Sequence, residues 1–314
     1  MERIINKTEE NKKKNLLKPK IDVVFHSLFR EENKKLLESL ISAALKEKVK
    51  VITTDKNRYL ETKDVNEKLG ILDLRVELED SKQCLVELQL EPCKNENDRF
   101  LYYWANSYAR QVKRGDKFYN LNKTISLIIV DHEIPELKGM EKPGVKWQIR
   151  DDCGGKQVLT EKLEIVIIEI PKAIRNYSKN SENPIIQWMM FFDNPNNKEV
   201  SKIMEKNKDI KVATEELYKI SNDDELRKIA ELREKAIRDE NATLAYYKEE
   251  GLKEGLKEGL EKGIEQGIEQ GKKQGIQEAK IEIIKRMIKA NMKIEQIMEL
   301  TNFTKEEIEK YANS

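Results

Sequence analysis

The sequence is poor in histidine and cysteine: its 314 residues include two histidines, His26 and His132, and three cysteines. Two histidines are too few for a metal site built from several histidine ligands. The cysteines are odd in number and form no C-x-x-C pair, which argues against a disulfide framework and a cysteine zinc site. His26 lies in an apolar stretch and His132 has no partner evident in the sequence, so we assign neither a role.

Long apolar segments are also missing. No apolar run approaches the roughly 20 residues that a membrane-spanning helix needs. The N-terminus is rich in lysine and has no apolar stretch behind it, unlike a secretory signal. We therefore expect a cytoplasmic protein that does not engage a membrane.

Charge is abundant but balanced. Charged residues make up 37% of the chain, and 59 Lys and Arg face 58 Asp and Glu. Bulk charge alone therefore does not hold nucleic acid, because phosphate neutralisation needs a local excess of cations. Hydrophobic residues are 38% and aromatic residues 6%, so we expect part of the chain to be solvated helix rather than core.

The order of apolar patterns predicts a mixed α/β fold. Helical spacing over residues 21–45 is followed by short strands, a hairpin, a helix and the apolar strands 124–130 and 163–170. We expect the following organisation: a flexible N-terminus over 1–17, an α/β core over 18–175, a helical region over 176–247, a glycine-repeat helical tail over 248–290 and a small helical hairpin over 291–314.

The predicted hairpin carries the candidate chemistry. Its two alternating runs, 71–78 and 84–91, share an apolar face only in the register that sets Asp73 opposite Glu87. Opposed like charges destabilise a sheet, and Mg²⁺ compensates for two carboxylates well, with Mn²⁺ as a substitute. Gln89 lies on the same face and could orient a water or a phosphate oxygen. The alternative is a solvated polar face on which Arg75 pairs with either acid.

Asp73 and Glu87-Leu88-Gln89 resemble the D…E-x-Q form of the PD-(D/E)XK nuclease core. The surrounding sequence is similar to the Rpn family of recombination-promoting nucleases, which are also described as transposases of this type. The similarity covers most of residues 20–280. It rests on these stretches in order, together with the tail glycines: Lys20–Phe25, Leu69–Asp73, Val86–Gln89 and Arg99–Trp104.

This resemblance implies a restriction-endonuclease-like core, with a mixed central sheet flanked by helices and a helical C-terminal extension. It implies an Mg²⁺-dependent DNA endonuclease that promotes recombination or mobile-element movement, with Asp73 and Glu87 as metal ligands. Gln89 stands where most of the superfamily has lysine, so stabilisation of the transition state would fall more heavily on the metal. Asp22 is either a third acid or the N-cap of the first helix. The competing function is an inactive nuclease-fold protein that binds DNA or self-assembles.

The helix after the hairpin offers DNA contacts. Arg99, Gln111 and Lys113 could touch phosphates, which position a duplex without reading its sequence. The aromatic residues of this helix are more simply explained as core, given their helical spacing: Tyr102, Tyr103, Trp104 and Tyr108.

Glycines recur at a strict four-residue interval from Gly251 to Gly275, and Leu or Ile follows most of them. Each glycine costs a helix about 1 kcal/mol against alanine, so the seven cost about 7 kcal/mol. The segment is either a self-association tail, in which glycine admits a partner helix closely, or a mobile linker. Beyond it, Thr304 and Glu307 predict a capping box, and the many acids of 294–311 favour a packing hairpin over a DNA-reading one.

Overall fold

The computed structural model describes residues 15–55, 74–112 and 115–312. The chain divides into two compact units, Met1–Ala236 and Ile237–Ser314. Within the described residues, no helix is both long and apolar enough to cross a membrane.

The first unit is built on a mixed sheet of six strands in the order β1-β2-β3-β4-β6-β5. Strands β3, β4 and β6 run parallel, and the remaining neighbours pair antiparallel. Both β4 and β6 are buried along their whole length, which explains their continuous apolar sequences. The strand bounds are β1 Val51–Asp55, β2 Leu74–Leu78, β3 Gln83–Gln89, β4 Thr124–Val130, β5 Gly144–Trp147 and β6 Leu163–Glu169.

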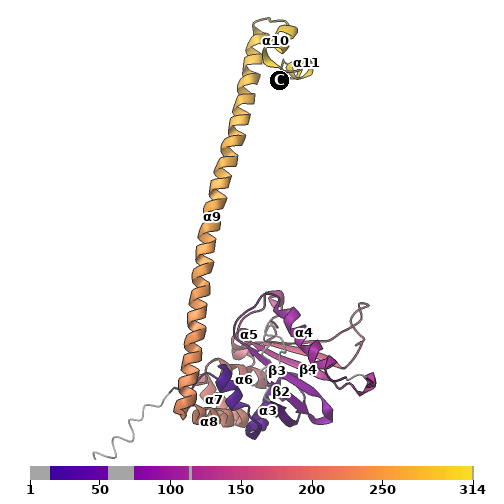
Figure 1. Cartoon of the computed structure of the whole chain (residues 1–314), viewed down its shortest axis with the longest axis vertical. Coiled ribbons are helices and arrows are strands. Elements are labelled where there is room, and N and C mark those ends of the chain that lie inside the picture. The colour runs from indigo at the N-terminus through magenta and orange to yellow at the C-terminus, as the bar shows by residue number, and fades with distance from the viewer. Residues whose placement is uncertain (1–14, 56–73, 113–114, 313–314) are drawn as a thin grey trace, which may run out of the picture. The chain divides into compact units, whose positions relative to one another are not determined.

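Helices cover both faces of this sheet (Figure 1). One face of the sheet packs in the larger core, together with aromatic side chains such as Phe25, Phe29 and Trp188. The N-terminal helices and the helices of 170–222 both contribute to this core. The other face packs on α4 through Phe100 and Trp104. The predicted α/β class with a mixed central sheet is confirmed. The helices of this unit are α2 Asp22–Leu28, α3 Lys34–Leu45, α4 Glu96–Ala109, α5 Ile170–Asn176, α6 Pro184–Asp193, α7 Lys198–Lys206 and α8 Lys208–Asn222.

The β2–β3 hairpin has the register expected from the sequence. Leu74 pairs with Val86, and Val76 pairs with Cys84. The turn Glu79–Ser81 is a short 3₁₀ segment in which Asp80 takes a left-handed conformation, with φ of 63°, as Asp tolerates better than most residues. Asp73 lies outside the described residues, so its pairing with Glu87 stays a prediction.

The second unit is helical. Helix α9, Asp224–Lys289, is one continuous helix of 66 residues that begins in the first unit and includes every glycine of the repeat. Its end packs with α10 Ile294–Thr301 and α11 Lys305–Ala312 through Ile284, Ile297 and Ile308. The predicted capping box is confirmed: the Thr304 amide donates to Glu307 at 2.9 Å, and the Glu307 amide donates to the Thr304 hydroxyl at 3.3 Å.

Candidate active site

The β3 part of the hairpin's polar face is covered, whereas Glu77 of β2 and Glu91 are exposed. Glu87 is 5% exposed and Gln89 is 8% exposed, because α4 packs over this face and Tyr103 contacts Leu85 of β3. Arg75, on the neighbouring strand, donates to Gln83 at 3.3 Å and to Ser107 of α4 at 3.1 Å. The interpretation of this face as solvated is therefore wrong for Glu87 and Gln89, and the buried acid Glu87 needs partners within the protein.

Arg99 is one partner of Glu87. Its Nη2 lies 3.1 Å from Oε1 of Glu87, and the side chains are 33% and 7% exposed. Arg99 belongs to the first turn of α4, which follows β3 and folds back over it. The residue expected to touch DNA therefore also neutralises a buried carboxylate.

Gln89 and His132 meet on the carboxylate of Glu96. The side-chain amide of Gln89 donates to the carbonyl oxygen of Glu91 at 2.7 Å and to Oε2 of Glu96 at 3.2 Å. Nε2 of His132 lies 2.8 Å from the same Glu96 oxygen, which accepts rather than donates. No sequence pattern singled out Glu96 or a partner for His132, and the structure brings the two side chains together. We call the five residues at the carboxyl ends of β3 and β4 the strand-edge cluster: Glu87, Gln89, Glu96, Arg99 and His132.

Unpartnered buried atoms concentrate in this cluster. Three of the five buried side-chain nitrogen and oxygen atoms without a hydrogen-bond partner in the described structure are Gln89 Oε1, Arg99 Nε and His132 Nδ1. Both partners of the Gln89 nitrogen are acceptors, which fixes the orientation of the amide and leaves Oε1 as its unused acceptor. Native proteins satisfy nearly all such atoms, so the cluster is suited to receive water, an ion or substrate.

The cluster lies at the carboxyl ends of two parallel strands, where open α/β sheets bind ligands. Gln89 pairs with Val130 at the end of β4, and the amide of Asp131 donates to the carbonyl oxygen of Gln89 at 2.9 Å. Lys20 reaches this edge and lies 2.7 Å from the Asp131 carboxylate. Burial raises the pKa of Asp131, and the hydrogen bond from Lys20 opposes that shift.

Asp22 lies apart from these contacts. It is the first residue of α2, after the N-cap Ile21, so the N-cap interpretation is wrong by one residue. Its carboxylate accepts from the Val23 amide at 2.8 Å and lies 3.5 Å from Nε of Arg233. These described contacts suit an acid in the first turn of a helix and include no member of the strand-edge cluster.

The other predicted DNA contacts have different outcomes. The Gln111 amide donates to the Thr124 hydroxyl at 2.7 Å and accepts from the Asn122 amide at 2.8 Å. It joins the end of α4 to β4, so we do not retain Gln111 as a DNA contact. Lys113 lies outside the described residues.

Most of the aromatic residues of α4 are core, as expected. Tyr103 and Trp104 are buried, and the indole of Trp104 donates to the carbonyl oxygen of Thr124 at 2.8 Å. Tyr108 stacks on Trp104, with ring centroids 5.0 Å apart. Tyr102 is 61% exposed, so the core assignment is wrong for this residue.

The donor set of the cluster fits a hard divalent cation. Among the described residues, no group of three or more His, Cys, Asp and Glu is arranged to hold a metal ion. Mg²⁺ needs no such cage, since one or two carboxylates and water satisfy it. The Glu87 carboxylate and the unused Oε1 of Gln89 are oxygen donors of this kind, and Asp73 is the second acid predicted from the sequence.

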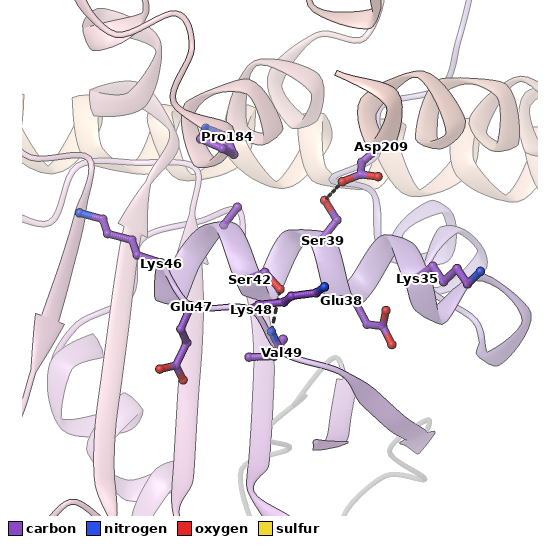
Figure 2. A pocket seen from close by; sticks show the side chains of 11 residues that line it. Lys35, Glu38, Ser39, Ser42, Lys46, Glu47, Lys48, Val49, Pro184 and Asp209 are labelled. Atoms are coloured by element: carbon purple, nitrogen blue, oxygen red, sulfur yellow. Dashed lines mark hydrogen bonds between the residues drawn. The ribbon is translucent and has the colours of Figure 1, made fainter. Parts of the chain in front are cut away.

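An open groove of about 580 Å³ lies elsewhere, along α3 (Figure 2). Several of its polar side chains are engaged within the protein: Ser39 donates to Asp209 at 2.6 Å, and Ser42 accepts from the Val49 amide at 3.1 Å. Glu38 accepts from the Val51 amide at 3.0 Å. The groove shares no residue with the strand-edge cluster and does not carry the candidate chemistry.

Comparison with known proteins gave one match. A family model described as PD-(D/E)XK nuclease family transposase matches residues 19–247, well over half of the chain. No curated protein and no solved structure matched.

Proposed function

The chain belongs to the PD-(D/E)XK nuclease family transposases, and from that premise we propose that it is a metal-dependent DNA endonuclease. The proposed reaction is hydrolysis of DNA phosphodiester bonds, in support of recombination or mobile-element movement in the cytoplasm. One observation carries this proposal. Glu87 and Gln89 of the E-x-Q motif are buried together at the strand edge, and an acceptor atom of Gln89 is left unused.

Asp73 and Glu87 would hold Mg²⁺, with Mn²⁺ as a substitute. The bound ion would polarise the phosphate and lower the pKa of a bound water. The role that we assign to Gln89 follows from its contacts. Because its nitrogen is held by Glu91 and Glu96, Oε1 can accept a hydrogen bond from the attacking water and aim it at phosphorus.

Glu96 and His132 are positioning residues in this proposal. Glu96 accepts from both the Gln89 amide and the His132 ring, so a single carboxylate fixes two side chains that arise from different strand ends. Fixed orientation of a reacting group accounts for a large part of enzymatic rate enhancement. We assign this function to the pair, and we assign proton transfer to neither residue.

Arg99 supplies a cation that position 89 lacks. Most of the superfamily has lysine where this chain has Gln89, and the guanidinium of Arg99 lies 3.1 Å from the neighbouring acid Glu87. It is partly exposed and has a spare buried Nε. We infer that Arg99 balances Glu87 without metal and contacts the scissile phosphate in the DNA complex, as arginine does at phosphate sites.

Nicking of supercoiled plasmid tests this function. The parent should nick in Mg²⁺ and stop in EDTA, and Asp73→Ala should lose the activity. Equal nicking by both proteins would point to a contaminating nuclease and would remove the proposal.

The second candidate is an inactive member of the family that binds DNA or assembles without cutting. The observation that favours it is Gln89 itself, because the motif lysine is absent. This candidate predicts that the parent binds a DNA duplex and leaves it intact in both Mg²⁺ and Mn²⁺.

A further inference from the structure

The second unit carries an uncovered apolar column on α9. Leu252, Leu256, Leu260, Ile264 and Ile268 are between 52% and 74% exposed. Between them run the glycines, and a methyl group built on any glycine from Gly251 to Gly275 would meet no atom within 4 Å. Glycine is a poor helix former, yet the described protomer gives no steric reason for it here. Close approach of another chain would supply such a reason.

We propose that α9 pairs antiparallel with α9 of a second copy, about a two-fold axis at Leu260. The apolar column is close to a palindrome around this residue. Leu260 faces itself. The polar interruption Lys272 falls opposite Lys248, which keeps both out of the apolar pairs but sets two like charges together. The remaining members match apolar with apolar: Leu256 with Ile264, Leu252 with Ile268 and Leu244 with Ile276.

The charges beside this column support the same register. On the flank one residue after the column, side chains lie two positions from the exact mate: Lys257 lies beside Glu265 of the second copy and Lys253 beside Glu269, while Glu261 lies beside itself. Within one chain Lys253 pairs with Glu249 at 3.3 Å, and Lys273 pairs with Glu269 at 2.7 Å. The antiparallel register brings these two intrachain pairs together as a network of four charges. Such networks stabilise an interface more than isolated surface ion pairs do.

A parallel, in-register pair uses the same residues less well. It would pair Lys253 with Glu254, Lys257 with Glu258 and Glu261 with Lys262. It would also leave Glu265 and Glu269 beside glutamines and set Glu249 beside Glu250. It would also oppose Tyr247 to itself in the glycine column, whereas the antiparallel register sets Tyr247 between Gly271 and Gly275 of the second copy. Side-chain size therefore favours the antiparallel arrangement, and this arrangement alone gives Glu265 and Glu269 a lysine of the second copy.

The geometry of a four-residue column gives the glycines a function. Each step of four residues turns about 40° and rises about 6 Å, so the column completes one right-handed turn in about 54 Å. If two helices wrap around each other with this pitch and their axes lie about 8 Å apart, the axes cross at about 50°. At this angle, the ridges that every fourth residue forms on one helix fit into the grooves of the other. Glycine permits that close approach, and the following Leu or Ile fills the opposing groove.

Cysteine cross-linking in the full chain tests the orientation. The background carries Cys93→Ser and Cys153→Ser and keeps the buried Cys84. Leu260→Cys should form an intermolecular disulfide on oxidation. Leu252→Cys alone and Ile268→Cys alone should not, because equal positions lie about 24 Å apart along the axis, whereas a mixture of the two should cross-link. Self-cross-linking of Leu252→Cys as strong as that of Leu260→Cys would overturn the proposal.

Charge exchange tests the register by a separate route. Lys257→Glu and Glu265→Lys should each weaken the dimer about tenfold in sedimentation equilibrium, as like charges then face each other, and the double variant should recover the parent Kd. In a parallel pair Glu265 faces glutamine, so rescue would not occur. Monomeric behaviour of the parent at all concentrations would also refute the proposal. These measurements need neither DNA nor metal, so their failure would leave the proposed nuclease function untouched.

Discussion

Nη2 of Arg99 lies 3.1 Å from Oε1 of Glu87, so the helix that follows β3 returns a cation to the buried carboxylate of that strand. A carboxylate buried without compensation is costly, and the ion pair removes part of that cost in the absence of metal. Glu87 can therefore be kept buried and charged at a strand edge, as a metal ligand requires. This relationship ties the stability of the strand-edge cluster to its proposed chemistry.

Gln89→Lys should keep or raise the cleavage rate. The new ammonium would lie near the two acceptors that hold the Gln89 nitrogen, Glu91 O and Glu96 Oε2, and would restore the cation that most of the superfamily has. Lysine has no acceptor to orient water, so direct stabilisation of the phosphate charge would take the place of that role. Gln89→Leu, of similar volume, should lose about 100-fold in single-turnover rate, since it removes the group that orients water. Cleavage by Gln89→Leu at the parent rate would show that the amide has no role.

Glu96→Gln should lower kcat about tenfold to 100-fold and leave KM for DNA nearly unchanged. An amide oxygen is a weaker acceptor than a carboxylate and holds the Gln89 amide and the His132 ring less firmly, and outer residues of this kind typically contribute factors of this size. Asp98→Asn, which alters an exposed acid in the same helical turn, is the matched control. Combining Glu96→Gln with Gln89→Leu should add little to the loss from Gln89→Leu alone. Fully additive losses would contradict the positioning role.

Glu164→Gln should reduce the dependence of stability on pH in acid. Glu164 is 2% exposed and lies 2.7 Å from Nζ of Lys123 and 2.8 Å from Nζ of Lys146. Burial is the largest single influence and acts to raise its pKa, but the hydrogen bonds from both lysines together hold the pKa below the ordinary 4.5. The group therefore stabilises the fold fully above about pH 4.5, and this stabilisation is lost as the pH falls through the folded-state pKa.

Urea unfolding between pH 3 and 7 measures this effect. Glu164→Gln should lower the free energy of unfolding by about 2 kcal/mol at pH 7, a value typical of hydrogen bonds to charged groups. The decrease should be smaller at pH 3. The exposed Glu161→Gln is the control. A loss that does not change with pH would show that the ion pairs do not account for it.

Gly259→Ala with Gly263→Ala should have opposite effects on the helix and on the dimer. Alanine should stabilise the α9 helix by about 1 kcal/mol per site, because a methyl group meets nothing in the protomer. The same methyl groups should hold two helices apart and weaken self-association at least tenfold. Circular dichroism and sedimentation measure the two effects. Unchanged self-association would favour the linker interpretation of the repeat.

Local patterns predicted the sheet well. Alternation over 84–91 fixed the faces of β3, and continuous apolar runs marked the buried strands β4 and β6. The register followed from keeping apolar faces together. These features depend on neighbours in sequence and on a simple periodicity, which a sequence shows directly.

The composition of the cluster was not predictable in the same way. Alternation shows which face Gln89 occupies but not that α4 covers it. His132 and Glu96 meet only because β4 runs parallel to β3 and α4 begins beside both strand ends. No short motif encodes a contact across 36 residues. An acid in the first turn after the E-x-Q strand was the one available signal for Glu96.

The rate of plasmid nicking by Glu87→Gln tests the central claim most directly. Glu77→Gln, an exposed acid on the adjacent strand β2, serves as the matched control, and all proteins are purified identically and assayed in Mg²⁺ and Mn²⁺. The nicking rate of Glu87→Gln should be at least 100-fold lower than that of the parent, while Glu77→Gln should nick at the parent rate. If Glu87→Gln nicks as fast as Glu77→Gln, the strand-edge cluster is not the site of DNA cleavage.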